Sequence, residues 1–174
     1  MSDQPMPDQS VSEPPDERLR LPVAEGVLLW CMRVWVLGLR REIDAEARIG
    51  AMLARLDAPD AAPYLDGFMF ALSRGATRRI AIHCACHDRV EGDERLLLHA
   101  LCLVQMGQLS WALHLLRGMA TDAAARAALS SAQGLGTELA LAGCYLHEDG
   151  PAGALSEADG YPAPAAVPCP ATLH

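Results

Sequence analysis

Apolar residues recur every three to four positions along the central part of this chain, which is the spacing that places them on one face of an α-helix. Phe68, Met69 and Leu72 illustrate that spacing. Helices are predicted at 23–41, 44–56, between 60 and 75, between 93 and 107, at 109–119 and at 121–146. We therefore expect an all-α fold, an irregular bundle of about five or six helices.

Residues that start and weaken helices refine this pattern. Asp60, Asp93 and Thr121 each stand where a side-chain oxygen can accept from the first free backbone N–H groups of a helix. Gly134 and Gly136 fall inside the last predicted helix and cost about 1 kcal/mol each relative to alanine. We expect that helix to bend or break at these two glycines.

One run of the central region is extended rather than helical. Residues 78–83 read RRIAIH, with Ile80 and Ile82 alternating against other side chains. The run is short and has no partner strand in the sequence. It is therefore expected to be an extended connector and not part of a sheet.

The two ends differ in composition from the centre. Residues 1–20 and 147–174 are rich in Pro and acidic residues and lack apolar periodicity, so we expect disordered tails around a helical domain at 21–146. The first tail has five acids and two arginines (−3), the second has four acids and no base (−4), and the centre has thirteen acids and twelve arginines (−1), which sum to the net charge of −8. A nearly neutral centre without a basic stripe argues against nucleic acid as the partner.

Composition also bears on where the protein works. The chain has no Lys and no Asn, which is typical of a GC-rich bacterial genome. Its main apolar run, 26–39, is interrupted by Arg33 and is about 14 residues long, whereas a membrane span needs about 20. No secretory leader is recognisable ahead of this run. We expect no membrane span, a cytoplasmic location and reduced cysteines.

The helical pair at 96–119 has small residues at distinctive positions. Ala100, Gly107 and Ala112 fall where helix pairs cross or turn, and Leu116 supplies a later apolar position. This stretch resembles one tetratricopeptide-type unit, which implies a helical hairpin. The early aromatic and the terminal proline of that repeat are missing, and no second copy follows at a period of about 34 residues. The peptide-binding groove of stacked repeats is therefore not predicted.

A cluster of cysteines and histidines is the strongest candidate for chemistry. The run HCACHD begins at residue 83, and two further ligand types follow three residues apart on the next helix. The candidate metal-ligating residues are His83, Cys84, Cys86, His87, His99 and Cys102. Tetrahedral zinc is held by four Cys or His groups, and Cys86, His87, His99 and Cys102 would make a Cys2His2 set if the run folded back on the helix.

Two other interpretations of the same cluster stay open. Zinc sites favour two to four residues between paired ligands, so a CxC pair is unusually tight. Small polarizable residues in a leucine-rich helix such as that of His99 and Cys102 often only fill the core. Alternatively, Cys84 and Cys86 could form a reducible disulfide, with neighbouring imidazoles favouring the thiolate.

Recognisable enzyme motifs are missing from the sequence. There is no phosphate-binding glycine loop, no GxSxG and no HExxH. We therefore expect a non-enzymatic interaction or adaptor protein that uses the hairpin surface, with another protein or a second copy as partner and no identifiable small-molecule substrate. It would need no cofactor. The alternative is a zinc-binding or thiol-redox sensor built on residues 83–87.

Overall fold

The computed structural model describes residues 21–41, 44–87, 89–90 and 92–147. These residues form six α-helices and one 3₁₀ turn and no strand, which confirms the all-α prediction. The predicted tails lie outside the described residues, apart from His147. The elements are α1 (Val23–Arg41), α2 (Ala45–Ala54), η1 (Pro59–Ala61), α3 (Ala62–Gly75), α4 (Gly92–Gln105), α5 (Leu109–Arg117) and α6 (Asp122–Leu141).

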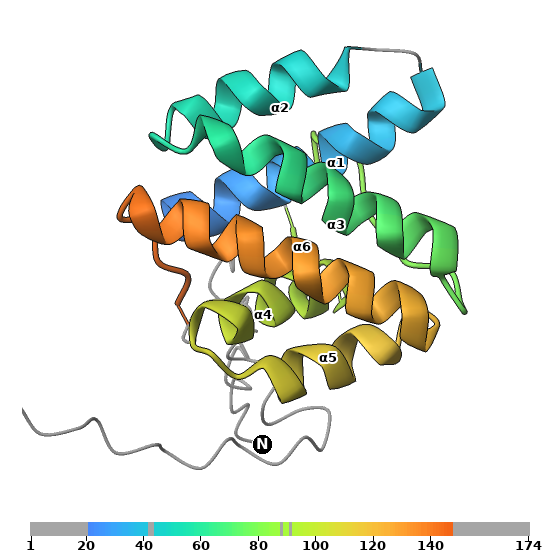
Figure 1. Cartoon of the computed structure of the whole chain (residues 1–174). Helices are drawn as coiled ribbons and strands as arrows, with labels where there is room; N and C mark the ends of the chain where they lie inside the picture. Colours follow the sequence, from blue (N-terminus) through green and yellow to red (C-terminus); the bar gives the residue numbers. More distant parts are fainter. Residues whose placement is uncertain (1–20, 42–43, 88, 91, 148–174) are drawn as a thin grey trace, which may run out of the picture.

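Helices α3 and α6 run side by side through the middle of the bundle (Figure 1). They are antiparallel, because Gly75 at the end of α3 lies against Ala124, whereas Tyr64 near its start lies against Gly134. Helix α2 lies on one side of this pair, α4 and α5 lie on the other, and α1 passes behind (Figure 1). The central pair therefore lies between α2 and the two helices α4 and α5.

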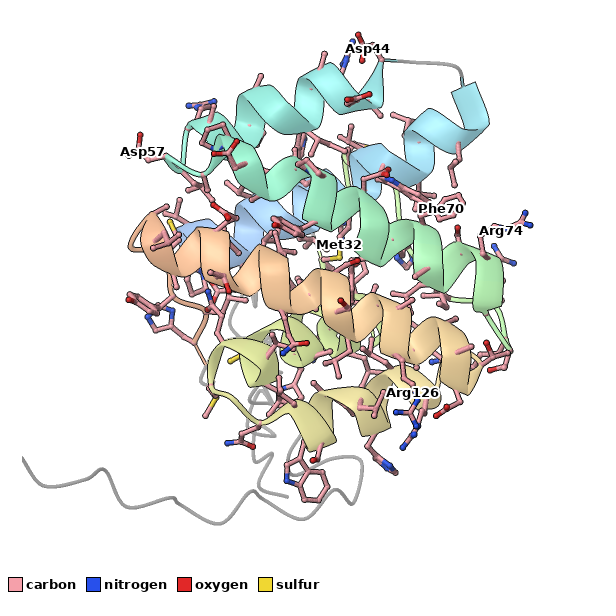
Figure 2. All side chains as sticks on the ribbon, viewed as in Figure 1. Met32, Asp44, Asp57, Phe70, Arg74 and Arg126 are labelled. Carbon is pink, nitrogen blue, oxygen red and sulfur yellow. The ribbon has the colours of Figure 1, made fainter. Side chains whose placement is uncertain are left out.

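The core is contributed by all six helices. Met32 of α1 points into the interior, whereas Arg74 and Arg126 lie on the outside (Figure 2). The largest fully buried side chains include Phe68, Leu97, Leu101, Leu116, Leu135 and Leu139. Their burial stabilises the fold by about 1.5–3 kcal/mol per side chain. Among the described helices, none combines the length and apolar character that a membrane crossing requires.

Two of the three predicted helix caps are wrong. Thr121 does cap α6, and its hydroxyl accepts from the Ala124 amide. Asp60, however, lies in the 3₁₀ turn before α3, and α3 begins without a side-chain cap. Asp93 lies inside the first turn of α4, where its carboxylate binds Arg78 instead of its own helix. The contact with Arg78 therefore takes the place of the predicted cap at Asp93.

Helix α6 is continuous over twenty residues, so it does not break at the two glycines. A Cβ atom at Gly134 would lie 2.3 Å from the Tyr64 ring, and one at Gly136 would lie 3.2 Å from the Gln105 side chain. The two glycines therefore allow neighbours to approach the helix. The helix ends at Leu141 rather than at Leu146, ahead of Gly143, whose φ of 73° leaves the helical region.

The predicted hairpin is present as α4 and α5. Gly107 lies in the turn between them with φ of 74°, a conformation that favours glycine. Ala100, Ala112 and Leu116 are fully buried. Gly107 thus serves the turn, and the small residues that allow close packing of the helices are the two alanines.

Candidate functional site

The connector that follows α3 carries the cysteine and histidine cluster. Residues 78–83 have no regular secondary structure and join no strand within the described part of the chain, in line with the predicted connector. Ile80 and Ile82 are half-buried against the core. Arg78 donates to both carboxylate oxygens of Asp93, at 2.6 and 2.9 Å, and the Ala81 amide donates to the same carboxylate at 2.7 Å. These contacts attach the connector to the first turn of α4.

A buried ion pair lies next to the residues that follow, 83–87, here called the dithiol loop. Arg33 of α1 donates from Nε to Oε1 of Glu94 at 2.8 Å and from Nη2 to Oε2 at 2.7 Å. Arg33 is 4% exposed and Glu94 is fully buried. A buried charge is tolerated only when it is paired and hydrogen-bonded, and this paired geometry on α1 and α4 meets that requirement.

The same ion pair also binds the loop backbone. The Arg33 guanidinium donates to the carbonyl oxygens of His87 at 2.5 Å and Arg89 at 2.6 Å. The His83 amide donates to Oε1 of Glu94 at 3.0 Å. Both ends of the dithiol loop are therefore attached to one rigid, buried anchor, although the loop itself has no regular secondary structure.

The two thiols of the loop are exposed and unoxidised. Cys84 and Cys86 are both free and exposed. The turn between them is closed by a hydrogen bond from the His87 amide to the Cys84 carbonyl at 3.0 Å. A cystine joins Cα atoms about 4.4–6.8 Å apart, a range that residues two apart in a turn satisfy. The loop thus presents two free thiols two residues apart in one turn.

The two thiols differ in acidity. A hydrogen bond from the Cys86 side chain, joined by one from its backbone amide, lowers the pKa of Cys84. The same thiol–thiol hydrogen bond and the negative charge of a Cys84 thiolate raise the pKa of Cys86. Only the thiolate is a good nucleophile. Cys84 is therefore the first of the pair to ionise.

The two loop histidines flank the thiols and stack on each other. The ring centroids of His83 and His87 lie 4.6 Å apart with 20° between the planes. Nδ1 of His83 lies 3.9 Å from Oε1 of Glu94. Four of the six predicted site residues are thus gathered within one short loop.

The other two predicted ligands lie on α4. Cys102 is buried, and its thiol lies 3.8 Å from the Leu146 carbonyl. It is eight residues beyond Glu94, which corresponds to about 12 Å along a helix. His99 is half-buried on the same helix. Among the described residues no three His, Cys, Asp or Glu side chains are placed to hold one metal ion, so zinc binding stays a prediction.

Arg33 and Glu94 are residues of the candidate site that the sequence did not identify. Arg33 was noticed only because it interrupts an apolar run, and Glu94 only as a residue of a first turn. An arginine within an apolar helix indicates a buried cation that requires a carboxylate. Which of the thirteen acids of residues 21–146 supplies it depends on contacts between residues 61 positions apart.

The predicted partner surface on the hairpin carries two exposed apolar side chains. Met106 is 45% exposed and Trp111 is 40% exposed. The Trp111 ring makes an edge contact with His114. The adaptor hypothesis at this surface stays a prediction. No protein-family model matches the chain, and no curated protein and no solved structure is significantly similar to it.

Proposed function

We propose that this protein is a thiol-based redox switch, in which a hydroperoxide oxidises Cys84 and Cys86 to an intramolecular disulfide. The observation that carries the proposal is the pair of exposed thiols, two residues apart in one turn, on a loop anchored by the buried Arg33–Glu94 ion pair. Exposure admits the oxidant, and proximity supplies the second thiol at high effective concentration.

The reaction has two steps. The Cys84 thiolate attacks the outer oxygen of the hydroperoxide, the O–O bond breaks, and the leaving alkoxide takes a proton from water as Cys84 becomes a sulfenic acid. Cys86 then attacks the Cys84 sulfur and loses its proton, and the sulfenic hydroxyl leaves as water. In total the two thiols give up two electrons and two protons, and the hydroperoxide is reduced to an alcohol and water.

Through the Arg33–Glu94 ion pair, oxidation of the loop can affect the packing of α1 and α4. A disulfide bond is about 2.05 Å long, shorter than a hydrogen-bonded thiol pair, so the turn at residues 84–86 must tighten. The His87 and Arg89 carbonyls accept from Arg33. A change in the turn therefore acts on the guanidinium of α1 and through it on α4.

The proposal is tested by locating the disulfide. The reduced full chain is treated with hydrogen peroxide, free thiols are blocked with N-ethylmaleimide, and the protein is digested with trypsin. Cleavage after Arg79 and Arg89 releases peptide 80–89, which contains Cys84 and Cys86 and no other cysteine. We expect this peptide to be about 2 Da lighter than its reduced form and unlabelled. Burial raises the pKa of Cys31 to about 12, so Cys31 stays reduced.

Single substitutions separate the roles of the two thiols. Cys86→Ser should react with peroxide but stop at a sulfenic acid that dimedone traps, because the resolving thiol is gone. Cys84→Ser leaves Cys86 without a partner thiol in the loop, so peroxide should produce no disulfide within peptide 80–89. Cys144→Ser removes a half-buried thiol outside the loop and serves as the matched control, with the rate of the parent.

Two results would overturn the proposal. One is that both thiols of peptide 80–89 remain open to N-ethylmaleimide after peroxide treatment, or that peroxide-treated Cys86→Ser carries no sulfenic acid at Cys84 that dimedone traps. The other is a content of about one zinc ion per chain in untagged protein purified under reducing conditions, with no zinc in Cys84→Ser or in Cys86→Ser. That second result would replace the redox proposal with the zinc hypothesis.

A further inference from the structure

A hollow of about 580 Å³ lies on the far side of the bundle from the hairpin, between the end of α1, the start of α2, and α3. The buried Trp35 and Ile49 are at its base. Leu39 and Phe70 line it as well and are 66% and 56% exposed. Figure 2 shows Phe70 on α3 and Asp44 at the start of α2. Two large apolar side chains that face solvent at one concave site are typical of a binding surface.

All the charged side chains described in the lining of this hollow are acidic. Asp44, Glu46 and Asp66 line it, all three are exposed, and no described lining residue is cationic. Oδ1 of Asp66 accepts from Nε1 of Trp35 at 2.7 Å, and Oδ1 of Asp44 accepts from the Ala47 amide at 3.0 Å. These hydrogen bonds hold two of the carboxylates at the rim without neutralising them.

We propose that this α1–α2–α3 hollow binds a basic amphipathic helix of a partner protein. An open groove bounded by helices accepts an apolar helix face through side chains at i, i+3 or i+4, and i+7. The carboxylates at the rim complement Lys and Arg on the flanks of such a helix. A second copy that packed hollow to hollow would bring the same carboxylates together, which is unfavourable.

The test uses a synthetic probe of that chemistry. A fluorescein-labelled peptide of about sixteen residues carries Leu and Phe on one helical face and Lys and Arg elsewhere, and a matched peptide carries Glu in place of Lys and Arg. Binding to the full chain is followed by fluorescence anisotropy at low ionic strength. The basic peptide should bind at least about ten-fold more tightly than the acidic one, and added salt should reduce the difference.

Variants locate the binding site. Leu39→Ser and Phe70→Ser each remove an exposed anchor and should weaken binding of the basic peptide about ten-fold without unfolding the protein. Glu46→Arg should weaken the basic peptide and strengthen the acidic one. Leu141→Ser changes a side chain that is 79% exposed on α6, outside the hollow, and is the matched control with unchanged binding.

Three results would overturn the proposal. The first is equal binding of the basic and acidic peptides, and the second is parent-like binding by both anchor variants while circular dichroism shows them folded. In the third, sedimentation shows a dimer of the parent chain that Phe70→Ser dissociates, which makes a second copy the occupant. None of these results bears on the disulfide, so the redox proposal stands or falls separately.

Discussion

Arg33 carries a full positive charge inside a helix whose neighbouring side chains, Met32 and Val34, are buried and apolar. Its two hydrogen bonds to Glu94 and its two bonds to loop carbonyls use most of the guanidinium donors. Arginine suits this role because its planar fork binds a carboxylate bidentately and stays charged when buried. At the scale of single residues, this pair determines where the dithiol loop lies.

Glu94→Gln tests the importance of the pair. The change keeps the shape of the side chain but removes the negative charge, so Arg33 is left buried beside a neutral amide. We expect the free energy of unfolding to fall by about 3 kcal/mol, the cost of breaking one side of a buried ion pair. Urea denaturation followed by circular dichroism measures it.

The double variant Arg33→Met with Glu94→Leu is the control. It removes both charges and fills the space with apolar atoms, so it should be more stable than Glu94→Gln. Its dithiol loop should still be more mobile than that of the parent, seen as faster amide exchange at His83. A Glu94→Gln variant within about 0.5 kcal/mol of the parent would contradict the role given to the ion pair.

The glycines of α3 and α6 act at the scale of the helix pair. A Cβ atom at Gly75 would lie 2.1 Å from the Cβ of Ala124 and 3.1 Å from the Thr121 hydroxyl. Because the Ala124 Cβ is attached directly to the backbone, it cannot move aside unless α6 moves. The close approach of these two helices therefore depends on glycine at this position.

Gly75→Ala should destabilise the protein by about 1–3 kcal/mol, since overpacking must push α3 and α6 apart. Gly50→Ala is the matched control. Gly50 lies inside α2 with nothing within 4 Å of an added Cβ. Alanine there should stabilise the protein by up to about 1 kcal/mol through helix propensity. Thermal unfolding of both variants, compared with the parent, measures the two effects.

The change in the free energy of unfolding should have opposite signs in the two variants. Adding Ala124→Gly to Gly75→Ala removes the clashing methyl group and should restore part of the lost stability. If Gly75→Ala stabilised the protein as much as Gly50→Ala does, the close packing of α3 on α6 would be refuted.

At the scale of the whole molecule, the connector between α3 and α4 joins the first three helices to the last three. Thr77 donates its amide to the Met119 carbonyl, and Thr121 donates to the Gly75 carbonyl. Arg78 and Asp93 then attach the connector to α4. Apart from an isolated β-bridge between Ala76 and Ala120, the connector has no regular secondary structure, so these contacts hold it against α4 and the turn between α5 and α6.

Asp93 makes this attachment sensitive to acid. Its hydrogen bonds from Arg78, with a smaller contribution from the Ala81 amide, hold the pKa of Asp93 below its usual value. A depressed carboxyl pKa adds stability that is fully present above the unfolded value of about 3.9 and is lost as the pH falls toward the folded value. Asp93→Asn should therefore cost about 1 kcal/mol at about pH 7, with that difference shrinking below about pH 4.

Urea denaturation of parent and Asp93→Asn across this pH range measures the difference. Asp60→Asn, an exposed carboxylate of the 3₁₀ turn, is the comparison and should show little effect at any pH. A difference between parent and Asp93→Asn that stayed constant from about pH 7 to about pH 3 would show that the lost contact is not the ionised carboxylate.

The sequence predicted all six helices, but it predicted the ends of some helices correctly and those of others wrongly. The bounds of α1 match the prediction, because a long apolar run between polar flanks is a local signal. Asp60 and Asp93 were assigned as caps from local rules, but the Asp93 carboxylate is taken by Arg78, fifteen residues away in the chain. Local rules make Gly134 a weak point of its helix. Its actual role is to make room for the ring of Tyr64, which belongs to another helix and therefore cannot be inferred from neighbouring residues.

The chain by itself determined the class of fold, the order of the helices, the extended connector and the grouping of His83, Cys84, Cys86 and His87, since all of these follow from neighbours in the sequence. Only the tertiary structure decided that Cys102 lies in the core, that Arg33 pairs with Glu94, and that Leu39 and Phe70 line one hollow. The reason is physical. Helix propensity and apolar periodicity act over a few residues, whereas a buried charge or a concave surface depends on which helix faces pack together.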